Sequence, residues 1–166
     1  MQVILVILFW VVVIFVGVKY SKWKKENAST KNRTGKYSVE YAKERDLTGH
    51  TWAFITSAKP EQVIGIIGDY IEKSQFELGG LHKFRVAERG DSKIIITFGF
   101  KGIPGFTAVL AFASGQTTAA YTIINWLQSD GVSTVTKQME ILLSVVKGAF
   151  TSLDSETRIE KISSKA

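Results

Sequence analysis

The hydrophobic residues of the chain are most concentrated at its N-terminus. Residues 3–18 read VILVILFWVVVIFVGV, with no charged side chain. As a helix, this run would be roughly 24 Å long, and it would be apolar on every face. The run has neither the basic region before it nor the small-residue cleavage point after it that a secretory signal would have. Residues 1–20 are therefore predicted to form one uncleaved transmembrane helix, with Tyr20 and Trp23 near the headgroups.

Basic residues are most frequent directly after this apolar run. Residues 19–46 contain nine Lys or Arg against four Asp or Glu, and the rest of the chain is nearly neutral. The positive-inside rule then places the N-terminus outside and the C-terminal domain in the cytoplasm. Anionic lipid headgroups are the expected counter-charge, and a nucleic acid is not, because the domain itself has little excess charge. The predicted lipid contacts are Lys19, Lys22, Lys24 and Lys25.

From about residue 47, the hydrophobic pattern becomes that of a folded domain. Residues 21–46 are rich in Lys, Ser, Thr and Asn and are predicted to be a tether. Residues 50–57 alternate as a strand does, and a helix follows from Pro60. Its expected apolar face consists of Val63, Ile64, Ile67, Tyr70 and Ile71.

Four further strands and a long helix complete the predicted domain. The strands are expected at residues 82–88, 93–100, 106–113 and 117–128, separated by glycine-containing turns. After Asp130-Gly131 the period becomes helical, with a stripe made by Val135, Met139, Leu142, Val146, Phe150 and Leu153. The fold class is thus α+β: a β-α-β4-α domain at residues 47–154, whose antiparallel sheet packs on the last helix. Residues 155–166 are predicted to be a polar tail, and a chain that starts at Gly49 is expected to fold alone.

This order of elements resembles that of helix-grip domains. Residues 56–63, TSAKPEQV, resemble the step from strand to helix in START-like and polyketide-cyclase-like domains. The chain lacks a second short helix and about two strands of that pattern. The resemblance implies a curved sheet around the last helix, and an apolar or lipid-like ligand between them.

Composition excludes several kinds of chemistry. The chain has no cysteine and two histidines, so thiolate chemistry is excluded and no metal site or cofactor is expected. His50 and His82 could form a general-base pair only if folding brings them together, and no nucleophile motif accompanies them. No catalytic residue is predicted, and an enzyme of the cyclase type ranks last among the functions considered.

Two functions remain open from the sequence. The first is a membrane-anchored binding module for an apolar ligand, in which Asn125 is either a structural amide or a ligand-orienting group. The second is a single-pass accessory or assembly subunit of a larger membrane complex. Ile95, Val109 and Ala111 favour it, since an outward apolar strip suggests a covered sheet. The expected pocket lining is Trp52, Phe54, Phe84, Phe98, Phe100, Phe106, Phe112, Tyr121, Asn125, Met139, Leu142 and Val146.

Overall fold

A computed structural model describes residues 36–74, 82–100, 102–114, 117–129 and 132–163. The chain divides into two units, residues 1–40 and 41–166. The apolar run at residues 3–18, predicted to be the anchor, lies outside the described residues. In the described part, no helix has both the length and the apolar character needed to span a bilayer.

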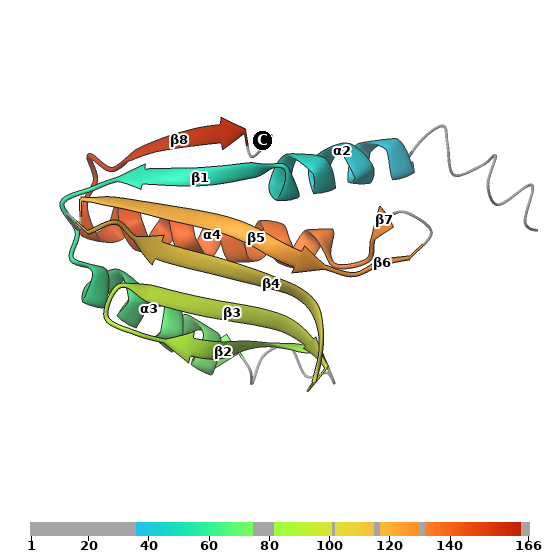
Figure 1. The fold of residues 1–166 in the computed structure, drawn as a ribbon, viewed down its shortest axis with the longest axis horizontal. Coiled ribbons are helices and arrows are strands. Elements are labelled where there is room, and N and C mark those ends of the chain that lie inside the picture. The colour runs from blue at the N-terminus through green and yellow to red at the C-terminus, as the bar shows by residue number, and fades with distance from the viewer. Residues whose placement is uncertain (1–35, 75–81, 101, 115–116, 130–131, 164–166) are drawn as a thin grey trace, which may run out of the picture. The chain divides into compact units, whose positions relative to one another are not determined.

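The second unit is an α+β domain (Figure 1). The helices are α2 (Lys36–Thr48), which crosses the unit boundary, α3 (Pro60–Ser74) and α4 (Thr136–Leu153). The strands are β1 (His50–Ile55), β2 (Lys83–Arg89), β3 (Lys93–Phe100), β4 (Ile103–Phe112), β5 (Thr118–Trp126), β6 (Gln128–Ser129), β7 (Val132–Ser133) and β8 (Arg158–Ser163).

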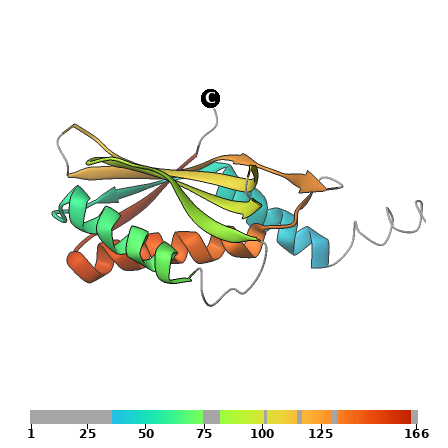
Figure 2. The same cartoon turned by 90° about the horizontal axis from the view of Figure 1, so that it is seen from below.

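Six of these strands form one antiparallel sheet. Their order is β2-β3-β4-β5-β1-β8, while β6 and β7 form a separate short hairpin. The predicted meander of four strands is confirmed as β2 to β5, and the predicted first strand pairs with the last of them as β1. Both α3 and α4 lie on one face of the sheet (Figure 2).

Every second side chain of the strands points to the face that the two helices cover and forms the core there. In β3, Ile94, Ile96 and Phe98 are buried, whereas Ile95 and Thr97 point to the other face and are half-buried. The alternation breaks after Phe98, where the register with β4 shifts. Gly99 at this shift has a φ of +141°, and a Cβ there would lie 2.5 Å from the Gly105 nitrogen, so only glycine fits.

The two helices complete the core with apolar faces at helical spacing. On α4, the side chains of Met139, Leu142, Val146 and Phe150 are buried, as predicted. On α3 the predicted face is confirmed except for Tyr70, which is 42% exposed. Leu153 at the end of α4 is also partly exposed, because the helix has passed the edge of the packed layer there.

The ends of the domain differ from the prediction. A helix occupies residues 36–48 where part of the tether was expected, and β8 lies in the predicted polar tail. The polar sequence of α2 has no apolar stripe; Leu47 and a hydrogen-bonded carboxylate, Glu44, supply its buried contacts. The six residues of β8 are nearly all exposed, and the strand forms because β1 offers it a free edge.

Candidate functional site

Most of the predicted pocket lining is brought together, as one packed core. Nine of the twelve residues are buried members of a single hydrophobic cluster, and Trp52 packs against it half-buried. Neighbouring rings are in contact: the Phe54 and Phe150 rings stack with centroids 4.3 Å apart, and those of Phe84 and Phe98 are 4.8 Å apart. The nine buried residues are Phe54, Phe84, Phe98, Phe106, Phe112, Tyr121, Met139, Leu142 and Val146.

Two of the predicted lining residues do not belong to this core. Phe100 is 42% exposed, because the register shift after Phe98 and the end of β3 take it out of the sheet's inner face. Asn125 is also exposed; it pairs with Thr107 across β4 and β5, on the face away from α4. Its amide is therefore neither a buried structural group nor directed into the core.

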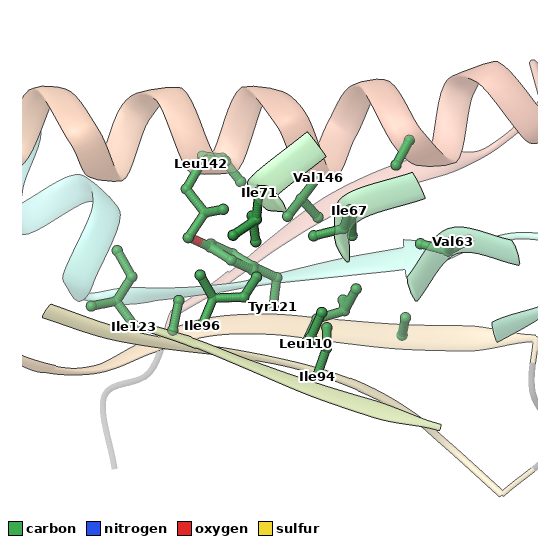
Figure 3. Close-up of a cluster of buried hydrophobic side chains, with 14 of the residues drawn as sticks. Val63, Ile67, Ile71, Ile94, Ile96, Leu110, Tyr121, Ile123, Leu142 and Val146 are labelled. Atoms are coloured by element: carbon green, nitrogen blue, oxygen red, sulfur yellow. The ribbon is translucent and has the colours of Figure 1, made fainter. Parts of the chain in front are cut away.

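The Tyr121 hydroxyl is a polar group inside the apolar core. Tyr121 is fully buried, and its Oη has no hydrogen-bond partner among the described residues. Figure 3 shows the hydroxyl directed toward Leu142 on α4. Burial raises the pKa of this phenol above its ordinary value, so the group stays neutral and can act as a hydrogen-bond donor.

The face of the sheet opposite the helices is apolar along its centre. We define the open face as Ile95, Val109, Ala111, Ala120 and Thr122. These residues are cross-strand neighbours: Val109 pairs with Ile95 on one side and with Thr122 on the other, and Ala111 pairs with Ala120. Neither α3 nor α4 covers this face (Figure 2). The open face is thus a smooth surface of small and β-branched side chains.

Charged side chains border the open face on its β2 side. Lys83, Arg85 and Lys93 lie there, as the strand pattern predicted. The Arg85 guanidinium donates to the Gly99 carbonyl oxygen at 2.6 Å, and Lys93 forms an ion pair with Glu88 at 2.7 Å. Strands β4 and β5 contain no charged residue at all. The result is an uncharged centre with a charged border, an arrangement common in protein interfaces.

A cluster around Trp52 links four elements near the β8 edge of the sheet. The Lys147 ammonium on α4 lies 3.8 Å from the Trp52 ring centroid, and that of Lys161 on β8 lies 5.2 Å from it. Lys161 also forms an ion pair with Asp46 on α2. Burial, and secondarily the charge of Lys161, lower the pKa of Lys147. These contacts hold β8 and α2 against β1.

Glu44 is a buried carboxylate that the sequence analysis missed. Its Oε1 accepts hydrogen bonds from Trp126 Nε1 and from Gln128 Nε2, and its Oε2 accepts one from the Ser133 backbone N–H at 2.7 Å. Glu44 is 1% exposed. It lay in a segment predicted to be a solvated tether, and no local pattern marks its partners, which are more than eighty residues away.

The two histidines are not brought together. His50 begins β1, and its Nδ1 lies 2.9 Å from the Asp46 carbonyl oxygen. His82 precedes β2 and packs against the Phe100 ring, with centroids 4.0 Å apart. Strands β3, β4 and β5 separate β1 from β2, a distance of roughly 19 Å. A general-base pair of these residues is therefore ruled out by the fold.

The remaining predicted site lies outside the described residues: Lys19, Lys22, Lys24 and Lys25 precede residue 36. In the described ranges, no three carboxylate or imidazole side chains are grouped as metal ligands would be.

Comparison of the chain with models of protein families found no match, and comparison with curated proteins found none either.

Proposed function

We propose that this protein is a membrane-anchored, non-catalytic interaction module: a single-pass accessory subunit that docks a partner protein on the open face. The single observation that carries the proposal is the uncharged, apolar centre of a sheet face that neither helix covers. In a layered domain, a sheet that is apolar on both faces is normally covered on both faces. The partner is a second membrane-associated chain with an apolar surface and an acidic group at its border, complementary to Arg85.

The proposed anchor is the apolar run at residues 3–18, with the domain in the cytoplasm. This part of the proposal is supported by the sequence: the length of the run and the basic residues that follow it. Anchoring limits the domain to a thin layer near the membrane. Encounters with a membrane-bound partner are then more frequent at a given number of molecules per cell.

The test uses the position of Val109 at the centre of the open face. The cysteine-free chain permits a single photo-crosslinker at a Val109→Cys or an Ile66→Cys position. Ile66 is the matched control, because it is a 39% exposed branched residue on α3, on the helix side of the sheet. We expect stoichiometric cross-links from position 109 in native membranes, and few from position 66.

A charge substitution completes this test. Val109→Glu should abolish the partner complex seen by native mass spectrometry after mild detergent extraction, while Ile66→Glu should leave it intact. Both variants should unfold at a denaturant concentration near that of the parent chain. A cross-link between two copies of this chain would show that the partner on the open face is a second copy and not another protein. Equal cross-linking from positions 66 and 109 would reject the open face as the interface.

The second candidate is the apolar ligand that the resemblance to helix-grip domains implies. Tyr121 favours it, because its buried hydroxyl has no partner among the described residues and is a group that a ligand oxygen could satisfy. Native mass spectrometry of the extracted chain should then show a co-purifying lipid. Tyr121→Phe should remove that lipid, whereas Tyr70→Phe, at an exposed tyrosine on α3, should not. A lipid-free parent chain would contradict this candidate and leave the interaction module.

A further inference from the structure

Three large apolar side chains are exposed together at one end of the sheet. The exposed fractions are 42% for Phe100, 64% for Ile103 and 54% for Leu127. Phe100 and Ile103 are cross-strand partners at the β3–β4 turn. The Leu127 N–H donates to the Gly105 carbonyl oxygen at 2.8 Å, which places Leu127 beside the start of β4. We call Phe100, Ile103 and Leu127 the apolar tip.

The backbone supports the exposure of the apolar tip. Gly99 and Gly102 both have positive φ, and the shift at Gly99 directs Phe100 away from the core. The His82 ring packs against the Phe100 ring and covers one side of it. The apolar tip therefore combines Phe100 and Ile103, at the facing ends of β3 and β4, with Leu127, which follows β5. Side chains of this size and exposure at a turn favour contact with an apolar phase.

Both ends of the sheet carry charged side chains. Lys83 at the start of β2 and Lys137 in the first turn of α4 lie at the end that carries the apolar tip. At the opposite end both signs of charge occur: Asp91 lies in the β2–β3 turn between Arg89 and Lys93, and Asp154 follows α4. Lysines beside exposed Phe, Ile and Leu are typical of segments that enter the headgroup layer of an anionic bilayer.

The chain enters the domain at the end with the apolar tip. Strand β1 begins at His50, and its register with β5 places that start near Ile123, close to the end of β5. Helix α2 leads into β1 directly. The proposed anchor precedes α2 in the sequence, so the chain that connects the membrane to the domain arrives at this end.

We infer that the apolar tip is inserted into the headgroup region of the bilayer that holds the anchor, with Lys83 and Lys137 facing anionic headgroups. This inference rests on the membrane anchor of the proposed function and not on the partner. Contact at this end aligns the strands roughly with the membrane normal. It leaves the open face at the side of the domain, accessible to a neighbouring membrane protein.

The experiment measures how close single positions come to lipid. The full chain, which has no cysteine, is labelled with an environment-sensitive fluorophore at Ile103→Cys or, as a control at the opposite end, at Asp91→Cys. Each chain is reconstituted in phosphatidylcholine–phosphatidylserine vesicles containing a lipid with a nitroxide quencher near the headgroup. We expect quenching at position 103 to exceed that at position 91 several-fold. Leu127→Cys, a second reporter on the apolar tip, should behave like position 103.

The outcomes separate the inference from the proposal on which it rests. Flotation of the labelled chains with the vesicles reports attachment through the anchor, the apolar tip or both, so a chain that does not float refutes the anchor and the inference together. A floating chain with equal, weak quenching at positions 91, 103 and 127 refutes only the inference. Strong cross-linking of position 103 to a protein in native membranes, without lipid quenching, would also overturn it. Labelled chains must share the unfolding midpoint of the parent for the comparison to count.

Discussion

Glu44 is a buried carboxylate at which several elements of the domain meet. Three donors, from β5, β6 and β7, meet its two carboxylate oxygens. A buried carboxylate is tolerated only when it is fully hydrogen-bonded, and here it satisfies N–H groups that would otherwise be unpaired. The same bonds attach α2 to the end of the sheet.

Glu44→Gln should destabilise the folded chain by about 1–3 kcal/mol. One of the two oxygens becomes an NH2 group that faces another donor, so at least one bond is lost and a repulsive contact replaces it. The matched control is Glu140→Gln, which removes an exposed ion pair with Lys43 at 3.0 Å and should cost at most about 1 kcal/mol. The measurement is chemical denaturation of the full chain in mild detergent. Equal costs for both changes would contradict the role assigned to Glu44.

Asp154 makes stability depend on pH at the acidic end of the range. The Ser57 backbone N–H, and then the hydroxyls of Thr56 and Ser57 and the Glu156 N–H, lower the pKa of Asp154 from 3.8 to about 2. The contribution of this carboxylate is therefore complete above pH 4 and is lost as the pH falls toward 2.

Asp154→Asn should lower the unfolding midpoint near neutral pH, because the amide cannot accept all four hydrogen bonds. The difference between Asp154→Asn and the parent should shrink as the pH falls from 4 to 2, where the parent carboxyl is itself protonated. Asp91→Asn controls for the loss of one exposed negative charge. A difference that stays constant from pH 7 to pH 2 would disprove the assignment.

At the scale of elements, the packing of α4 on the sheet distinguishes a filled core from a pocket. Leu142 is 1% exposed and lies at the Tyr121 hydroxyl (Figure 3). Leu142→Ala should cost about 2–5 kcal/mol if the core is filled. Leu153→Ala, at a 37% exposed position on the same helix, should cost much less. A small cost at Leu142 in a denaturant titration without added lipid would instead favour the apolar-ligand candidate.

Helix α2 moves the start of the domain to an earlier residue than the hydrophobic pattern predicted. A chain that begins at Gly49 lacks the buried Leu47 and Glu44, whereas one that begins at Tyr41 keeps both. The chain from Tyr41 should be the more stable of the two by at least about 2 kcal/mol, from the Leu47 side chain and the bonds of Glu44. Comparison of their urea midpoints checks this. Identical midpoints would mean that α2 adds nothing to the fold.

At the scale of the whole molecule, the sequence predicts the orientation in the membrane. Residues 24–166 should be protected when protease is added to intact cells, because the basic residues after the proposed anchor would resist translocation. Permeabilised cells are the control, in which the domain becomes accessible. Digestion from outside in intact cells would reverse the assigned topology.

The sequence alone was sufficient for the local features of this protein. Strand alternation and the glycine turns predicted the meander, and helical spacing predicted α3 and α4, because these signals are confined to neighbouring residues. The outward apolar strip of Ile95, Val109 and Ala111 was predicted in the same way, since residues on one face of a strand follow a period of two.

Only the tertiary structure decided the features that depend on distant residues. Helix α2 and strand β8 have polar sequences, and they are stabilised by Glu44 with its remote donors and by the free edge of β1. The exposure of Phe100 and Asn125 follows from register shifts between strands, which a period of two cannot show. The burial of the Tyr121 hydroxyl beside Leu142 could not be predicted from the sequence. Whether a polar atom is buried depends on all the residues packed around it, and these come from distant parts of the chain.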